Sequence, residues 1–333
     1  MCRQIVIAAC AFLQRSEGAI KIMSNIEIVR VLLFLAVVGF IYGITLILIV
    51  RWFYLRFFLH ELSPRPLSKG GKIILCLAFI GLFCMAYGHW IEPYWIEVSH
   101  VNLSSPKLSG ATHPLRIAHI SDLHCDPVVH VEDKMIATIA NEKPDLIVFT
   151  GDTMNEAASL LVLKQTLTKV SAIAPTFVVK GNWDVWYYPT LDLFGGTGVR
   201  ELKDEAVKFD VAGTSLWLIG SPVAQQPNFE KALAAVPPNV YQLLLYHYPD
   251  EIEAAKKYHV DLYCAGHTHG GQIALPFYGA LLTFSKFGKK YEAGLFHEDE
   301  TWLYVNRGIG IEGAPRFRFF ARPEVTMIEI SGQ

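Results

Sequence analysis

Side chains that bind metal ions follow five short apolar runs of the chain. An aspartate and a histidine come together after the first run, and two histidines come together after the last. Carboxylate oxygen and imidazole nitrogen suit zinc, manganese and iron ions alike, so these residue types point to metal-assisted chemistry. The five segments are Ser121-Asp122-Leu123-His124, Thr150-Gly151-Asp152, Gly181-Asn182-Trp183-Asp184, His247, and Gly266-His267-Thr268-His269-Gly270-Gly271.

The spacing within these segments favours a site for two ions. In extended backbone, Asp-x-His and His-x-His each point two side chains to the same face. One carboxylate can bridge two ions about 3.5–4 Å apart, and such a pair clamps a phosphate and generates hydroxide at neutral pH. A lone histidine after a strand is usually only hydrogen-bonded, and a lone Gly-Asp is usually a turn. Five such signatures in order predict a dinuclear metal site.

The elements that must position these groups form an alternating pattern. The apolar runs Leu115–Ile120, Leu146–Phe149, Thr176–Val179, Leu243–Tyr246 and Leu262–Ala265 alternate with segments of helical spacing. Such alternation predicts an α/β layered domain. Ligand sites in α/β sheets lie beyond the carboxyl ends of the strands, so separate strand ends can converge on one place. Further strands are expected at 216–219, 302–305 and 325–330, and helices at 131–141, 156–172 and 250–258.

The amino-terminal third is a different kind of sequence. Residues 31–50 and 73–91 contain no Asp, Glu, Lys or Arg, and about twenty apolar residues cross a bilayer as a helix. We therefore expect two transmembrane helices and a multi-pass protein of the cell membrane. The expected organisation is an N-terminal tail at 1–30, a helix at 31–50, a basic loop at 51–72, a helix at 73–91, a linker at 92–114, and one catalytic domain at 115–333.

Charge suggests which side of the membrane the domain faces. The 51–72 loop holds five Lys and Arg against one Glu, while residues 92–106 contain no Lys or Arg. The positive-inside rule then puts the loop in the cytoplasm and the catalytic domain outside it. Basic residues within 1–30 argue weakly for the opposite placement. The net charge of −2 does not suggest a nucleic-acid partner, and six Cys without a CxxC pair exclude a disulfide scaffold.

Together the motifs resemble the calcineurin-like metallophosphoesterase family. The family pattern is DxH, GD, GN-H-D/E, a lone H and GHxH, and the match extends over about 115–332. The segments 266–283 and 304–330 also resemble the membrane-associated YkuE/YaeI-like subgroup. The resemblance implies a four-layer α/β/β/α sandwich and hydrolysis of phosphoester bonds.

The resemblance also implies which residues bind the two divalent ions, which would be Mn, Zn or Fe. One ion would take Asp122, His124, Asp152 and His269, and the other Asp152, Asn182, His247 and His267. Asp152 would bridge the ions together with a water or hydroxide, which would attack phosphorus. Asp152, Asn182 and Asp184 make up the expected catalytic set, with Asp184 orienting a ligand such as His124 or His247.

The main departure from the family pattern is Trp183, where the family usually has histidine after Asn. An indole N–H donates a hydrogen bond but cannot act as an acid near pH 7. We therefore expect weak hydrolysis of poor leaving groups, which favours diesters or diphosphates with good leaving groups. Trp183 is also a candidate substrate contact, as part of an aromatic lip with Trp186, Tyr187 and Tyr188. Arg307, with Arg316 and Arg318, is a candidate for binding a substrate phosphate.

Some neighbouring residues have ordinary structural explanations. His119 lies inside a strand and is expected in the core. Cys125 and Cys264 are expected to pack rather than to bind metal. Asp126 is interpreted as a turn residue, with a ligand or hydrogen-bonding role as the alternative.

The sequence leaves three functions open. The first is a membrane-anchored phosphodiesterase or diphosphate hydrolase, with a lipid-linked phosphate as the hypothesised substrate. The second is a UDP-2,3-diacylglucosamine pyrophosphatase of lipid A synthesis, which requires a cytoplasmic catalytic domain. The third is a non-catalytic metal-binding membrane module, for which Trp183 is the one supporting feature.

Overall fold

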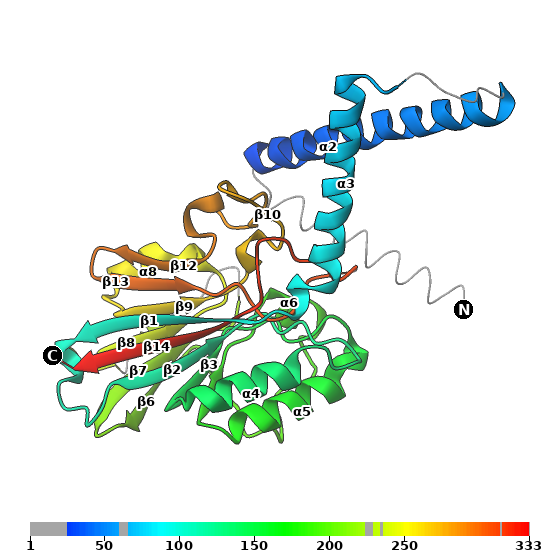
Figure 1. Ribbon diagram of the computed structural model, residues 1–333. Helices are drawn as coiled ribbons and strands as arrows, with labels where there is room; N and C mark the ends of the chain where they lie inside the picture. The colour runs from blue at the N-terminus through cyan, green and yellow to red at the C-terminus, as the bar shows by residue number, and fades with distance from the viewer. Residues whose placement is uncertain (1–24, 60–65, 224–228, 234–235, 314, 333) are drawn as a thin grey trace.

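Two six-stranded sheets lie face to face in the part of the chain that carries the motifs (Figure 1). The computed structural model describes residues 25–59, 66–223, 229–233, 236–313 and 315–332. The strand order is β1-β14-β2-β3-β4-β5 in the first sheet and β12-β13-β9-β8-β7-β6 in the second, and β10 and β11 form a separate hairpin.

The elements have the following bounds. The first sheet comprises β1 (Glu97–Ser105), β2 (Leu115–Ile120), β3 (Leu146–Phe149), β4 (Thr176–Val178), β5 (Arg200–Glu201) and β14 (Glu324–Gly332). The second sheet comprises β6 (Glu205–Val211), β7 (Thr214–Gly220), β8 (Tyr241–Leu245), β9 (Leu262–Ala265), β12 (Gly294–Glu298) and β13 (Thr301–Val305), and the hairpin comprises β10 (Ala274–Leu275) and β11 (Gly279–Ala280). The helices are α2 (Asn25–Phe53), α3 (Lys69–Trp90), α4 (Glu132–Glu142), α5 (Leu160–Ser171), α6 (Asn182–Tyr187), α7 (Phe229–Leu233) and α8 (Ile252–Lys257).

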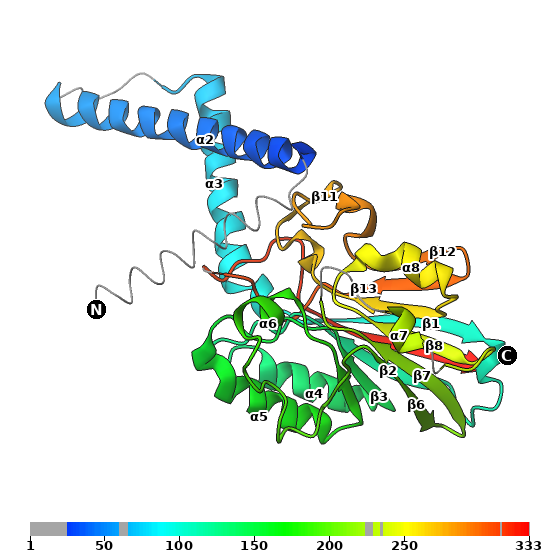
Figure 2. The ribbon, with the colours of Figure 1, turned by 180° about the vertical axis from the view of Figure 1, so that it is seen from behind.

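Three apolar cores separate four layers. Alternate residues of β2 face opposite ways: Ile117 packs between the two sheets, and Ile120 packs toward α4 and α5. A third core lies between the second sheet and α8, around Tyr263 and Ile252. Figures 1 and 2 show α4 and α5 outside one sheet and α8 outside the other. The predicted α/β/β/α sandwich is confirmed.

Parallel pairing brings the motif-bearing strand ends together. β2 pairs in parallel with β3, and β3 with β4. In the second sheet β7, β8 and β9 are also parallel neighbours. The loops after β2, β3 and β4 therefore leave one edge of the first sheet, and those after β8 and β9 leave one edge of the second. The predicted strands match the observed ones closely because each is a buried apolar run.

The expected linker at 92–114 is wrong over much of its length. Residues 97–105 form β1, an edge strand that pairs in parallel with β14 along its whole length. Only Leu103 among its hydrophobic side chains is buried, so the segment lacks the apolar run by which a strand is found in sequence. Backbone pairing with β14 makes the strand, and the catalytic domain therefore begins before residue 115.

The amino-terminal helices are longer than predicted. α2 starts at Asn25 and continues as a π-helical turn at Tyr54–Phe58, and α3 starts at Lys69. Asn25–Phe58 and Lys69–Tyr94 are each long and apolar enough to span a membrane, and their apolar windows are 0% and 11% buried. They are therefore not core helices of the domain. Residues 1–24 and 60–65, on which part of the charge argument depends, lie outside the described residues.

Candidate dinuclear metal site

The strand ends bring six of the predicted ligands into two neighbouring groups. Asp122, His124 and His269 form one group, and Asp152, His247 and His267 form the other, with the ligand atoms of each group within 4.8 Å of one another. These groups correspond to the two ion sites implied by the family resemblance, apart from Asn182 and the shared Asp152.

Short distances within and between the groups show how closely the ligand atoms approach one another. Nε2 of His269 lies 3.2 Å from Oδ1 of Asp122, and Nε2 of His247 lies 3.1 Å from Oδ2 of Asp152. The same Oδ2 of Asp152 is 3.8 Å from Nε2 of His124 in the other group. Asp152 thus faces both groups, which is the position of a bridging carboxylate.

The backbone at these positions adopts conformations that non-glycine residues rarely use. Asp122, His124, Asp152, His267 and His269 all have φ between 38° and 72°. Such residues concentrate at functional sites, where the surrounding structure must hold them. They place the ligand side chains in the space beyond the strand ends.

Two motif glycines are required by close packing. A Cβ atom on Gly181 would lie 2.2 Å from Oδ1 of Asp152, and one on Gly266 would lie 1.8 Å from the Ser121 hydroxyl. A side chain at either position would displace the loops that carry the ligands.

Three of the four ligand histidines are held by an acceptor at the other ring nitrogen. Nδ1 of His124 lies 3.0 Å from Oδ1 of Asn155, and Nδ1 of His247 contacts the Thr150 carbonyl at 2.5 Å. Nε2 of His267 lies 3.3 Å from the Phe284 carbonyl. Such outer contacts fix which nitrogen faces a metal, here Nε2 for His124 and His247 and Nδ1 for His267.

Asp184 has a different role from the one predicted. It contacts neither His124 nor His247, whose partners are Asn155 and Thr150. Its Oδ2 accepts the backbone N–H groups of Asp152 at 3.0 Å and Gly181 at 2.9 Å, and its Oδ1 accepts the N–H and hydroxyl of Thr153. The buried carboxylate therefore ties the Asp152 loop to the start of α6, and it is a positioning residue.

The buried carboxylates and histidines of the site shift one another's pKa values. Burial would lower the pKa of His247, but Asp152 and Asp122 outweigh burial and raise it to about 9. Burial would raise the pKa of Asp122, but His269, His247 and His124 outweigh burial and lower it. Burial lowers the pKa of His267 to about 3. The two carboxylates therefore attract positive charge to their centre.

Buried polar atoms without hydrogen bonds test whether metal ions fit. Nε2 of His124, Nε2 of His247 and Oδ1 of Asn182 are all buried, and among the described residues they have no hydrogen-bond partner. Nε2 of His247 is close to Asp152, but the two are not in hydrogen-bonding geometry. Two ligands of one cation lie close together in this way without a hydrogen bond between them. A buried polar atom without a hydrogen-bond partner lowers the stability of the fold. A divalent ion that accepts nitrogen and oxygen ligands would give these atoms a partner. The residues fit two ions.

Asn182 and Trp183 lie at the start of α6, beside Asp152. The backbone N–H of Trp183 donates to Oδ1 of Asp152 at 2.8 Å. The indole ring is buried and packs edge-on to His124, with ring centroids 5.0 Å apart, and also against Tyr187. The side chain that replaces the family histidine thus forms part of the wall around the site.

The predicted phosphate-binding arginines are paired elsewhere. Arg307 donates to Glu324 at 3.2 Å and to Glu97 at 3.0 Å, so two carboxylates already neutralise it. Arg316 pairs with Asp126. The geometry does not support a substrate-binding role for Arg307.

Arg318 contacts the site from behind. Its fully buried guanidinium donates to backbone carbonyls, and Nη2 lies 3.3 Å from Nδ1 of His269. Burial lowers the pKa of Arg318 to about 9, so it stays charged at neutral pH.

The structural interpretations of His119, Cys125 and Cys264 are confirmed, whereas Asp126 has the hydrogen-bonding role that was the alternative for it. His119 is fully buried between Thr150 and Tyr304. Cys125 and Cys264 are buried in two different cores. Asp126 accepts a hydrogen bond from Nδ2 of Asn155 at 2.9 Å, so its role is to hold the residue that holds His124.

Three residues for which the sequence suggested no contact with a ligand support the ligands. Asn155 contacts His124, Phe284 contacts His267 through its carbonyl, and the Tyr248 ring lies 4.2 Å from the His267 ring. Asn155 and Tyr248 each follow a motif residue by one to three positions, which is the signal that could have found them. Phe284 acts through its backbone, which leaves no signal in the sequence.

Comparison with known proteins identifies the family. The family model for calcineurin-like phosphoesterase matches residues 115–271. The metallophosphoesterase YkuE of Bacillus subtilis is 32% identical over 73% of this chain and 88% of its own length. The chain belongs to the calcineurin-like phosphoesterase family. It is therefore a metal-dependent hydrolase of phosphoester bonds, and the alternative of a non-catalytic module is set aside.

Two further relatives carry more specific names. The phosphodiesterase YaeI of Escherichia coli is 32% identical over 73% of this chain and 92% of its own length. The UDP-2,3-diacylglucosamine pyrophosphatase LpxG of Chlamydia muridarum is 27% identical over 73% of this chain and 91% of its own length. The expected YkuE/YaeI-like subgroup is confirmed.

Proposed function

We propose that this protein is a membrane-anchored, dinuclear metal-dependent phosphodiesterase or diphosphate hydrolase that acts on lipid-linked phosphates. The observation that carries the proposal is the pair of ligand groups around Asp152, with buried imidazole and amide atoms that lack a hydrogen-bond partner and that a cation would satisfy. One ion is proposed to take Asp122, His124, Asp152 and His269. The other is proposed to take Asp152, Asn182, His247 and His267.

The chain's own groups set up the reaction. Two ions in this site would supply a nucleophilic water at neutral pH and neutralise charge on the phosphate. Asp152 holds both halves of the site together, and Asp184 holds the Asp152 loop in place. Asn182 offers a buried amide oxygen at the start of α6 that an ion could bind.

Trp183 supports the choice of substrate class. No acidic side chain stands where the family has histidine, so the leaving group must depart without a proton from that position. Proton transfer is typically worth 10²–10⁴-fold in rate. Diesters and diphosphates, whose leaving groups are themselves good, suffer least from its loss.

The lipid-linked substrate is supported by the exposed apolar surface. α2 and α3 are apolar along their length and belong to the same chain as the catalytic site. Trp186 on α6, Phe277 at the tip of the β10–β11 hairpin, and Trp90 at the end of α3 are all exposed. Trp and Tyr favour membrane interfaces, so such residues suit a site that works at a bilayer surface.

The reaction is tested with the detergent-solubilised full chain. Wild type is expected to hydrolyse bis-p-nitrophenyl phosphate with Mn²⁺, and Asp152→Ala is expected to lose this activity. Activity that survives the substitution would contradict the bridging role. Much faster turnover of soluble nucleotides than of phospholipids or lipid diphosphates would refute the lipid-linked substrate.

A UDP-2,3-diacylglucosamine pyrophosphatase is the second candidate, favoured by the relatives of that name. Its diphosphate substrate would tolerate the missing histidine. It requires the catalytic domain in the cytoplasm, whereas the charge of the 51–72 loop favours the opposite side. A reporter that works only outside the cytoplasm can be fused to the carboxyl terminus. Activity of that reporter would exclude this candidate.

A further inference from the structure

The start of α2 is joined to the catalytic domain by a buried carboxylate. Glu27 is 1% exposed, and its Oε1 accepts both the backbone N–H and the hydroxyl of Thr283, each at 3.1 Å. Figures 1 and 2 both show the first turns of α2 beside the β10–β11 hairpin. Glu27 therefore fixes the loop that follows β11.

This loop contacts a ligand of the metal site. Phe284 directly follows Thr283 and has a φ of 55°. Its carbonyl lies 3.3 Å from Nε2 of His267. A continuous path of hydrogen bonds and one peptide link thus leads from α2 to a ligand histidine.

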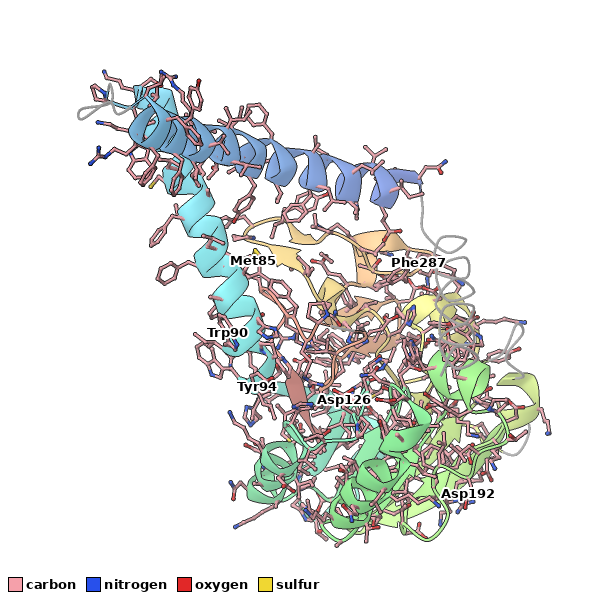
Figure 3. The ribbon with its side chains drawn as sticks, turned by 90° about the vertical axis from the view of Figure 1, so that its right-hand side faces the viewer. Met85, Trp90, Tyr94, Asp126, Asp192 and Phe287 are labelled. Atoms are coloured by element: carbon pink, nitrogen blue, oxygen red, sulfur yellow. The ribbon has the colours of Figure 1, made fainter. Side chains whose placement is uncertain are left out.

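The end of α3 is joined to a second loop in the same manner. The Gly88 carbonyl accepts the N–H of Arg318 at 2.9 Å, and Nδ1 of His89 contacts the Arg316 carbonyl at 2.7 Å. The fully buried carboxylate of Glu92 accepts the N–H groups of Phe320 and Ala321 at 2.9 and 2.5 Å. Figure 3 shows Trp90 and Tyr94 where α3 meets the domain, near Asp126.

Arg318 carries this second contact into the metal site. Its guanidinium donates to the carbonyls of Gly308 and Gly310 and lies 3.3 Å from Nδ1 of His269. The Gly310 N–H in turn donates to the Asp122 carbonyl at 2.7 Å. The end of α3 therefore supports the segment that holds both His269 and the Asp122 loop.

These contacts exceed what a covalent tether requires. A tether needs only a peptide connection, and burying a carboxylate is costly unless it is hydrogen-bonded. Glu27 and Glu92 are both buried, and each is satisfied by donors of a loop that contacts a ligand histidine or leads to one.

We propose that the domain-side ends of α2 and α3 are positioning elements of the metal site. Glu27 sets His267 through Thr283 and Phe284. The end of α3, with Glu92 two residues beyond it, sets the Asp122 loop through Arg318, whose guanidinium also lies against His269. The inference rests on the proposed metal site, and it means that the apolar helices and the catalytic chemistry are not separable modules.

The test measures Mn²⁺ binding to the detergent-solubilised full chain, by titration calorimetry and by the electron paramagnetic resonance signal of coupled Mn²⁺ pairs. Outer contacts of metal ligands are worth about 10–100-fold in metal affinity. Glu27 holds the loop that makes such a contact, so Glu27→Ala is expected to weaken one of two Mn²⁺ sites by about tenfold, the lower end of this range, and to reduce the coupled signal. Glu27→Gln keeps an oxygen acceptor for Thr283 and is expected to bind nearly as wild type.

Matched controls separate positioning from general damage. Glu253→Ala removes an exposed glutamate paired with Lys256 and is expected to change nothing. Gly88→Ala would place a Cβ 2.8 Å from the Arg318 carbonyl and 2.5 Å from the Phe317 ring, whereas Gly70→Ala meets nothing within 4 Å. Alanine has a higher helix propensity than glycine, so neither substitution should weaken its helix. Weaker Mn²⁺ binding in Gly88→Ala but not in Gly70→Ala therefore supports the proposal.

The outcomes distinguish this inference from the proposed function. Wild type that binds no Mn²⁺ overturns the proposed function and this inference with it. Wild type that binds two Mn²⁺, together with Glu27→Ala of equal affinity and equal coupled signal, overturns this inference alone. The Glu27 pair decides the result even if Gly88→Ala does not fold.

Discussion

Replacing Asp184 with asparagine is the sharpest test of how the site is held. The substitution keeps the shape of the side chain but turns one oxygen into an NH₂ group. If Oδ2 is replaced, the N–H groups of Asp152 and Gly181 lose their acceptor and face another donor. Hydrogen bonds to charged groups contribute about 1.5–3 kcal/mol each, so the two losses amount to about 3–6 kcal/mol.

A second effect offsets part of this loss. Burial, with Asp152 nearby, raises the pKa of Asp184 from its usual 3.8 to about 6 even though its hydrogen bonds lower it, so the cost of burying the charge exceeds what those bonds return. Asparagine carries no charge and avoids that cost. We therefore expect Asp184→Asn to lower the free energy of unfolding by only about 0–3 kcal/mol.

Metal binding should change far more than stability. Because Asp152 faces both ligand groups, loss of its loop contacts should weaken Mn²⁺ binding by about tenfold or more. Urea unfolding and Mn²⁺ titration of the same preparation measure the two effects.

The matched control is Asp192→Asn. Asp192 is an exposed carboxylate that accepts the Gly195 N–H at 2.8 Å, and in Figure 3 it lies in the part of the domain away from α2 and α3. This variant should keep wild-type Mn²⁺ affinity. Wild-type Mn²⁺ affinity in Asp184→Asn would refute the positioning role of Asp184.

Three further predictions follow from the same geometry. Trp183→His should raise the turnover of diesters with poor leaving groups by about 10²-fold or more and change p-nitrophenyl esters little; equal gains on both would contradict the account of the missing acid. Burial lowers the pKa of His119 from 6.5 to about 4. Between these two pH values His119 is protonated in the unfolded chain but not in the folded chain. Stability is thus lost as pH falls, and His119→Gln should reduce the loss between pH 7 and 4.5 by about 2 kcal/mol in urea unfolding, whereas exposed His259→Gln should not. Mn²⁺ at a hundred times its dissociation constant should stabilise the fold by about 2.7 kcal/mol per site over chelator-treated protein, and an unchanged melting temperature would argue against bound ions.

The sequence by itself determined the buried strands of the sandwich and the ligand types. Strands such as Leu146–Phe149 and Leu262–Ala265 are buried on both faces, so their residues are continuously apolar and visible as runs. The ligands follow such runs at fixed spacing, because parallel strands deliver their carboxyl ends to the same edge of a sheet. The two amino-terminal helices could also be predicted from the sequence, because each contains an apolar run long enough to span a membrane.

Only the tertiary structure decided how these groups are supported. β1 is an edge strand formed by backbone pairing with β14, and such pairing leaves little trace in side-chain pattern. Asp184, Glu27 and Glu92 all act on backbone N–H groups, which every residue except proline carries and which no motif can mark. Arg307 and Arg318 have the same chemistry in sequence, yet one is neutralised by Glu324 and the other contacts His269. Which partner a charged side chain meets depends on the packing of distant segments, and that packing exists only in the folded chain.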